Sequence, residues 1–523
     1  MAYDKAKILH HLEHLTDHEE PDVDDPAGED ILTEDLGGHE VETATLSDAA
    51  GHAGEQTNDP STEHNIFLCQ HLQELSQSDQ NPGTSTGSVL NENKTTSCQR
   101  VIIIDGMALV NGISKTEQMK TCRDFAQSFI EQLENIAVHY DEVRLVFDRY
   151  IDKSLKAKMR QKRTKGKSTY YHVRDSTLIQ KIPLKHFLSN VKTKAELTEY
   201  LAVKCLAYSE AHPNKLKKFM VTSGTKTTGN TEVPESLRTH SHEEADTLLI
   251  LHALTVDKDA EVTIDSPDTD IFLLLIHKCH ELPPATRFIT GKGKFRRSIA
   301  VKPVHDKLGE KCASAILGFH AFTGSDMSGR FAGRSKDWCF KVFLTCDSKI
   351  WEALESLGQA DPSQQVYSQL ERFVCLLYKS KVHTRVNELR WFLFSNRAAE
   401  GESLPPTTGS LKLHVQRAQY MAMVWRKAAE SHPSLPSPVG YGWQLLSDEN
   451  TYVPVRCLNP PAPEALMNLL KCGCKKGCMG RCTCRNNSIP CTEVCGCVGY
   501  TCNNKANTSE LSVINMDEDQ RDT

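Results

Sequence analysis

The chain has 523 residues, enough for two or three domains that each bury a hydrophobic core. No run approaches eighteen apolar residues, which argues against a membrane-spanning protein. The net charge of -7 is unevenly distributed: residues 1–100 carry 21 acidic and 4 basic residues, and the remainder carries 47 (68 minus 21) and 57 (61 minus 4). An acidic leader before a basic body indicates either a solvating tail or a tail that competes with an anionic partner for the basic surface.

Residues 1–98 are polar, and we expect them to be disordered. Order begins at Val101–Ile104, a β-branched run typical of a buried parallel strand. We expect further strands at Val143–Phe147, Lys218–Thr222, Glu261–Ile264, Arg287–Ile289 and Arg297–Ala300. We expect helices at Cys122–Tyr140, Leu178–Leu188, Ala195–Ser209, Glu243–Leu254 and Ile271–Cys279. This alternation predicts an α/β fold with a parallel sheet and helices on both faces.

The chain divides further by composition. After the α/β domain (99–340), residues 341–430 have a mainly helical period, clearest at Gln364–Tyr378 and Leu411–Lys427. A Pro-rich connector (431–470), a cysteine-rich module (471–505) and a disordered tail (506–523) follow. His240, His242 and His252 have no ligand spacing with cysteine and are expected to be structural or surface residues.

Acidic residues recur where the predicted strands end. Five segments contribute seven of them: Asp105, Asp148, Glu244, Asp246, Asp268, Asp270 and Asp326. The carboxyl ends of parallel strands form the ligand crevice of an open sheet, so we expect these side chains to meet there. Carboxylates this close raise each other's pKa unless cations neutralise them, and oxygen ligands suit Mg²⁺ or Mn²⁺. Two such ions at this site predict a metal-dependent nuclease.

Each acid also has a local explanation. Asp105 precedes Gly106 and fits a turn, and Asp268 fits the N-cap of the next helix. Glu243 and Glu244 are the kind of residues that favour a helix N-terminus. The recurrence of acids at several strand ends is what favours a shared site.

Nine of the nineteen cysteines lie in the last fifty-two residues, in C-x-C pairs with short spacers. They are Cys472, Cys474, Cys478, Cys482, Cys484, Cys491, Cys495, Cys497 and Cys502. Thiolates favour tetrahedral zinc, and three Zn²⁺ need twelve ligand positions, which nine sulfurs supply if three bridge. The alternative is a disulfide-rich tail, which requires an oxidising compartment. The other ten cysteines are scattered, as reduced core cysteines are.

The segment KCGCKKGCMGRCTCRNNSIPCTEVCGCVGYTCNN resembles one CXC repeat of the tesmin-like cysteine-rich family, whose members bind DNA. The resemblance implies a zinc-folded DNA anchor and a nuclear location. Many CXC repeats have a Tyr before the second C-x-C pair, where this chain has Arg481, a residue suited to a narrow minor groove.

The segments IIIIDGM, VFDRY, EADTLL, SPDTDIFLL and ILGFHAFTGSD are similar, in order, to the PIN-like domain of flap-endonuclease and XPG-type nucleases. That resemblance implies a two-metal site at the seven acids. The chain departs from the pattern at Arg149, where the family has Gly, and in the shortened hairpin MSGRFAGRSK. The whole arrangement also resembles uncharacterised animal proteins that join the two domain types.

Basic residues supply candidate nucleic-acid contacts. The run Lys153–Lys167 can neutralise phosphates, act as a nuclear-localisation signal or form a solvated face. GKGKFRRS (Gly291–Ser298) is a second patch with a hairpin-like turn. The residues assigned to nucleic-acid binding are Lys158, Arg160, Lys162, Arg163, Lys475, Lys476, Arg481 and Arg485.

Two functions remain open from the sequence. The first is a nuclear, divalent-metal-dependent DNA nuclease, with RNA as an alternative substrate. The second is an inactive PIN-like scaffold that binds chromatin through the CXC module, an interpretation motivated by Arg149 and the shortened hairpin.

Overall fold

The computed structural model describes residues 98–151, 154–156, 168–291, 293–325, 327–395, 403–446 and 451–459. In the cysteine-rich module it describes residues 472–475, 478, 481–486, 491, 495–497 and 502–504. The expected acidic leader, apart from residue 98, and the expected tail lie outside these ranges. None of the helices in the described parts is both long and apolar enough to cross a membrane.

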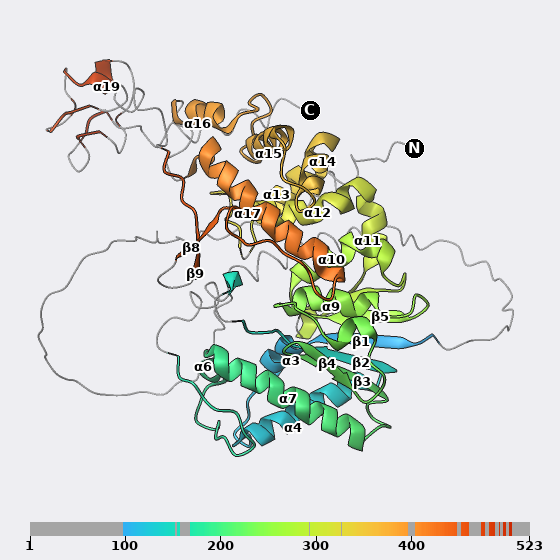
Figure 1. Cartoon of the computed structure of the whole chain (residues 1–523). Helices are drawn as coiled ribbons and strands as arrows, with labels where there is room; N and C mark the ends of the chain where they lie inside the picture. Colours follow the sequence, from blue (N-terminus) through green and yellow to red (C-terminus); the bar gives the residue numbers. More distant parts are fainter. Residues whose placement is uncertain are drawn as a thin grey trace, which may run out of the picture. The chain divides into compact units, whose positions relative to one another are not determined.

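A seven-stranded sheet lies at the centre of the α/β domain (Figure 1). Its strands are β1 (Arg100–Asp105), β2 (Glu142–Val146), β3 (Lys218–Ser223), β4 (Lys226–Gly229), β5 (Glu261–Asp265), β6 (Arg287–Thr290) and β7 (Arg297–Ala300). The order across the sheet is β4-β3-β2-β1-β5-β6-β7. The five inner strands are parallel, and β4 and β7 pair antiparallel at the two edges. The predicted α/β fold is therefore confirmed, and β4 is an additional strand.

Helices cover both faces of the sheet (Figure 1). They are α3 (Gly106–Gly112), α4 (Cys122–Ala137), α6 (Leu184–Phe187), α7 (Val191–Ala211), α8 (Glu235–Arg238), α9 (Ala245–Leu254), α10 (Thr269–His277), α11 (Val301–Leu308) and α12 (Glu310–Thr323), with the short 3-10 helices η1 (Cys279–Glu281) and η2 (Gly293–Phe295). Ile102 and Leu145 pack with α4 and α7, whereas Ile103 and Ile264 pack with α9 and α10. The period of two along each strand divides the core into these two layers.

The helices that follow share the second of these layers. They are α13 (Lys336–Thr345), α14 (Ser348–Ser356), α15 (Gln364–Leu377), α16 (Val386–Ser395), α17 (Thr408–Arg426) and η4 (Lys427–Ala429). Phe340, Phe373 and Trp425 are fully buried in the same hydrophobic cluster as Leu249 of α9 and Phe272 of α10. The helical region therefore stabilises the layer that carries two of the acidic segments.

Two further elements lie toward the C-terminus. The expected connector contains an antiparallel pair, β8 (Trp443–Leu446) and β9 (Thr451–Pro454), which the sequence did not predict. The cysteine-rich module contains one short helix, α19 (Thr483–Asn486).

The expected helix at Leu178–Leu188 is wrong in its first half. Leu178 forms a β-bridge with Thr121, and only Leu184–Phe187 becomes helical, starting after Pro183. Proline disfavours helical backbone in the residue before it, so the helix begins only beyond that position. The apolar spacing of this segment reflects packing against α4 and α7, because Ile179 and Phe187 are both buried in that layer.

Several predictions about side chains can be checked in the described residues. His240, His242 and His252 are all at most 5% exposed, so the surface alternative is wrong and the structural one holds. His252 Nε2 lies 2.9 Å from Thr222 Oγ1, which ties α9 to β3. Most of the scattered cysteines are buried, and all that are described are free thiols, as expected for reduced core cysteines.

We predict that Gly318→Ala strongly destabilises the protein. A Cβ at position 318 would lie 1.8 Å from the backbone oxygen of Leu354, so α12 and α14 would have to separate. A cost of about 2–3 kcal/mol in the free energy of unfolding is expected, measured by urea denaturation. The control is Gly112→Ala, where an added Cβ meets nothing within 4 Å. Equal stability of the two variants would contradict this packing.

Candidate functional site

The predicted acids lie where the inner strands end. Asp105 is the last residue of β1, Asp148 follows β2, and the remaining described acids begin α9 and α10. The chain runs from β1 to β2 and β3 on one side and later to β5 and β6 on the other. The site therefore lies at the point where strand order reverses, which is where open α/β sheets bind ligands. Asp326 lies outside the described residues.

Backbone and hydroxyl donors hold the first two acids. Asp105 accepts the Ala108 N–H through Oδ1 at 3.0 Å and the Ser266 hydroxyl through Oδ2 at 3.0 Å. Asp148 Oδ1 accepts the N–H of Ala245, the first residue of α9, at 2.8 Å. The acid after β2 thus binds the N-terminus of a helix that starts nearly a hundred residues later.

The local explanation of Asp268 as an N-cap is also correct, whereas Asp105, expected in a turn, is instead the N-cap of a helix. Asp105 is the N-cap of α3, and Asp268 is the N-cap of α10, where it accepts the Asp270 N–H at 2.9 Å. Ser266 links the two caps, because its oxygen accepts the Asp268 N–H at 3.2 Å while its hydroxyl donates to Asp105. Capping fixes both carboxylates on rigid elements and is compatible with a shared site.

The acids act electrostatically on one another. Burial, and then the charge of Asp148, raise the pKa of Asp105 to about 6. Burial raises the pKa of Asp246 well above its usual value, and Asp268 and Glu244 raise it further. Burial also raises the pKa of Glu244. Asp105 of β1 and the two acids at the start of α9, Glu244 and Asp246, therefore resist ionisation, and the charges of Asp148 and Asp268 contribute to this.

Lys156 places an ammonium group in this cluster, although the basic run that contains it was interpreted as facing phosphate or solvent. Its Nζ lies 2.8 Å from Glu244 Oε1, and both side chains are less than 15% exposed. The positive charge of Lys156 also opposes the raised pKa of Asp246, and it contributes to the lowered pKa of Asp270. The sequence did not predict that Lys156 pairs with an acid, because the basic run has no periodic pattern that would distinguish this lysine from the others.

Asp270 is stabilised in its charged form by a buried histidine. Burial acts to raise its pKa, but His320 and more distant cations outweigh burial and lower the pKa to about 2. His320 Nε2 lies 2.7 Å from Asp270 Oδ1, and the ring stacks on Trp425 at 5.0 Å. The buried ammonium of Lys336 donates to the His320 backbone oxygen at 2.9 Å. The sequence offered no signal for His320, since it joins Asp270 only through helix packing.

The acid cluster fits divalent cations that retain water. No three described carboxylates bring their oxygens within 4.8 Å of one another, so the described residues form no closed cage of protein ligands. Mg²⁺ is usually held by one or two carboxylates and keeps several waters, which this open spacing allows. Burial, and then neighbouring acids, raise the pKa values of Asp105 and Asp246, so both would gain from a nearby cation.

We predict that Asp105→Asn stabilises the metal-free protein at neutral pH. The folded-state pKa of about 6 lies above the usual 3.8, so folding favours the protonated acid, and stability falls as pH rises through 6. Asparagine keeps the cap and removes the charge, which should add on the order of 2 kcal/mol at pH 7.5 and little at pH 4.

Urea unfolding in EDTA at the two pH values measures this difference. Asp259→Asn, at an exposed position, serves as the control and should change stability at neither pH. When the same urea denaturation is repeated with Mg²⁺, the ion should raise the free energy of unfolding of wild type more than that of Asp105→Asn. Loss of stability in Asp105→Asn at pH 7.5 would contradict the electrostatic account.

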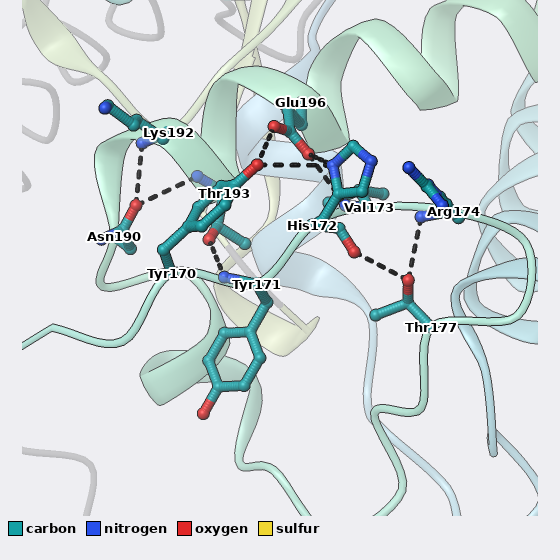
Figure 2. A network of polar contacts seen from close by, with 10 residues as sticks. All are labelled: Tyr170, Tyr171, His172, Val173, Arg174, Thr177, Asn190, Lys192, Thr193 and Glu196. Atoms are coloured by element: carbon teal, nitrogen blue, oxygen red, sulfur yellow. Dashed lines mark hydrogen bonds and ion pairs between the residues drawn. The ribbon is translucent and has the colours of Figure 1, made fainter.

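Of the residues assigned to nucleic-acid binding, Lys158, Arg160, Lys162, Arg163 and Lys476 lie outside the described residues. The chain that follows the basic run is held on α7, as Figure 2 shows. Glu196 Oε1 accepts the Tyr170 hydroxyl, while Oε2 pairs with His172 Nδ1 at 2.7 Å and accepts the Val173 N–H at 2.9 Å. Residues 170–173, which follow the run, are therefore fixed to α7.

The cysteine sulfurs are spaced as ligands of shared metal ions. Seven Sγ–Sγ pairs among the nine cysteines lie 3.4–3.8 Å apart. Two thiolates on one tetrahedral zinc, with Zn–S about 2.3 Å, are about 3.8 Å apart, whereas a disulfide holds its sulfurs at about 2.05 Å. All nine are free thiols, so the disulfide alternative is wrong.

Three groups of four cysteines have mutually close sulfurs. They are Cys472, Cys474, Cys478 and Cys482; Cys472, Cys484, Cys491 and Cys495; and Cys472, Cys478, Cys491 and Cys497. Cys502 belongs to none of them, although its Sγ lies 3.7 Å from that of Cys497. Each group has the composition of a structural zinc site.

The described basic residues of this module are exposed. Lys475, Arg481 and Arg485 all have solvent-accessible side chains. Arg485 Nη1 also donates to the Cys478 backbone oxygen at 3.3 Å, so its guanidinium is positioned against the cluster. The structure thus places three cations on the surface of the module.

No family model and no curated protein matches this chain. Among solved structures, the chain is similar to the bacteriophage T5 D15 flap endonuclease in a pseudo-enzyme–product complex with DNA and metal ions. The identity is 11%, the match covers 63% of this chain and 99% of that one, and the TM-score is 0.30. The T5 D15 protein co-crystallised with metal ions gives 12% identity, 64% and 100% coverage, and a TM-score of 0.30. Both similarities are weak.

Proposed function

We propose that this protein is a divalent-metal-dependent nuclease that a zinc-bound cysteine module anchors to DNA. The observation that carries the proposal is the coupled group of six described acids at the carboxyl edge of the sheet. A fold has no structural need for six carboxylates at one edge, three of which, Asp105, Glu244 and Asp246, have raised pKa values, and such perturbed groups cluster at functional sites.

Metal ions are the cofactor that fits this group. Two Mg²⁺ or Mn²⁺ ions held by Asp105, Asp148, Glu244, Asp246, Asp268 and Asp270, with Asp326 as a further candidate, would supply a nucleophile at neutral pH and stabilise charge on phosphate oxygens. The residues around the acids have separate roles in the proposal. Ser266 orients Asp105 and Asp268, and His320 orients Asp270. Lys156 balances part of the charge at Glu244.

The cysteine module is proposed to bind three zinc ions. The support is an arithmetic match: if Cys502 replaces Cys472 in the third four-cysteine group, nine sulfurs fill twelve positions, with Cys472, Cys478 and Cys491 each used twice. Those three would be the bridging thiolates.

DNA is the proposed partner, because zinc and thiolate charges leave a surplus of cations on the module. Three Zn²⁺ and nine thiolates sum to -3, whereas the module has six basic residues, including Lys475, Arg481 and Arg485. The surplus can neutralise phosphates and makes binding salt-dependent. A nuclear location is part of the same proposal and accords with the basic run at Lys153–Lys167.

We predict that the full-length protein with Mg²⁺ or Mn²⁺ cleaves flap, hairpin or single-stranded DNA. Asp246→Asn should reduce the rate at least about 100-fold, since it removes a carboxylate coupled to Asp268 and Glu244. Cleavage is measured by gel electrophoresis of end-labelled substrates, with an RNA panel in parallel. The control Asp259→Asn changes an exposed acid and should cleave like wild type.

Failure of the wild-type protein to cleave any member of the panel would refute the enzyme proposal. Preferential cleavage of RNA would change the substrate class and leave the site assignment standing.

The alternative is a catalytically inactive scaffold that binds DNA through the cysteine module. One observation favours it: Lys156 already pairs with Glu244 at 2.8 Å and supplies a protein cation to the acids. Under this proposal, DNA binding survives the loss of all the acids.

We predict that DNA binding depends on the cysteine cluster under both proposals. Cys472→Ser removes a thiolate proposed to bridge two of the zinc ions and should lower the zinc content and weaken DNA binding at least about tenfold. Cys457→Ser changes a cysteine outside the cluster and is the control. Zinc is measured by mass spectrometry and binding by fluorescence anisotropy. Binding that persists after zinc chelation would exclude the module as the anchor.

A further inference from the structure

A second group of metal-ligating side chains lies away from the acids and the cysteines. His280 belongs to η1, His305 to α11, and Glu310 is the first residue of α12. One ligand atom from each lies within 4.8 Å of the other two. Three separate elements therefore bring two imidazoles and one carboxylate to a single point.

The distances within this group match those between ligands of one ion. Glu310 Oε2 lies 2.9 Å from His280 Nε2 and 3.7 Å from His305 Nε2. With zinc–ligand bonds of about 2.0–2.1 Å, ligand atoms on a tetrahedral ion are about 3.4 Å apart. The two measured distances lie on either side of that value.

His305 supplies independent support for a ligand at this point. It is 5% exposed, and its Nε2 is directed at Glu310. Its other nitrogen, Nδ1, is 3.5 Å from Asp306 Oδ1 but completes no hydrogen bond among the described residues. A buried imidazole nitrogen without a hydrogen bond leaves the ring free of a competing partner, so its Nε2 remains available to a ligand on the Glu310 side.

We infer that His280, His305 and Glu310 form a Zn²⁺ site with three protein ligands and an open fourth position. Two imidazoles and a carboxylate make a ligand set typical of zinc. The set is distinct in chemistry from the all-oxygen acid cluster and from the all-sulfur cysteine module.

The site lies at the opposite end of α10 from the acids. Asp268 caps the first turn of α10, and η1 follows its last turn after nine residues, about 14 Å along the helix axis. A zinc ion bound by His280, His305 and Glu310 would link η1 to the junction of α11 and α12. Since α10 carries Asp270 and α12 carries His320, the ion would hold together the two helices whose contact orients Asp270.

The competing explanation is a simple ion pair between His280 and Glu310. Both side chains are more than 60% exposed, and exposed pairs contribute little to stability. An ion pair explains one of the two distances and leaves the buried His305 ring, 4.6 Å from that of His280 and nearly perpendicular to it, without a role.

The test measures zinc per full-length chain by mass spectrometry, after saturation with Zn²⁺ and removal of unbound metal. His280→Ala should hold one equivalent fewer than wild type, and Glu310→Gln should bind that equivalent more weakly. His139→Ala, at an exposed histidine after α4, is the control and should match wild type. Every variant keeps all nine cysteines, so the difference reports only on this site.

Two further readouts separate the site from the cysteine module and from a folding defect. Co²⁺ bound by these nitrogen and oxygen ligands should give visible bands without thiolate charge transfer, and His280→Ala should lose those bands. The circular dichroism spectra of the His280 and Glu310 variants should match that of wild type, because both substituted side chains are exposed. Equal zinc content and equal Co²⁺ spectra in wild type and His280→Ala would overturn the proposal and leave only the ion pair.

Discussion

Repulsion among carboxylates at the end of β1 is the constraint around which the neighbouring structure is arranged. Asp105 and Asp246 sit where burial and neighbouring acids both oppose ionisation, and their pKa values rise accordingly. Nearby groups partly offset that repulsion: Ser266 donates to Asp105, Lys156 pairs with Glu244, and backbone N–H groups at three helix starts bind carboxylate oxygens. Divalent cations would offset the rest, and this is the physical basis of the metal-dependent function that we propose.

Helix α17 supports the acidic edge of the sheet through His320 of α12. His320, stacked on Trp425 of α17, contacts Asp270 and keeps its pKa low, in contrast to the raised pKa of Asp246 on the neighbouring helix. The first turns of α9 and α10 therefore present to the same site one carboxylate with a raised pKa and one with a lowered pKa. In the cysteine module, sulfurs take the place of a hydrophobic core, because that segment is too short to bury one.

Much of the fold could be predicted because buried parallel strands appear in the sequence as short continuous apolar runs. Val101–Ile104 and the central parts of β2, β3 and β5 are buried on both faces, so their apolar runs mark them directly. The expected helix at Leu178–Leu188 failed because burial against α4 and α7 produces an apolar spacing without helical backbone. The β8–β9 pair was missed because its short strands have exposed side chains and no strong alternation.

The sequence alone determined the α/β class, the position of the acids after the strands, and the nine cysteines with metal-ligand spacing. These are local properties, since strand burial and ligand spacing appear within a few consecutive residues. Only the tertiary structure decided that Lys156 turns toward the acids, that His320 supports Asp270, and that His280 meets His305 and Glu310. Each of these contacts joins elements that are distant along the chain, and helix packing, which no short segment encodes, brings them together.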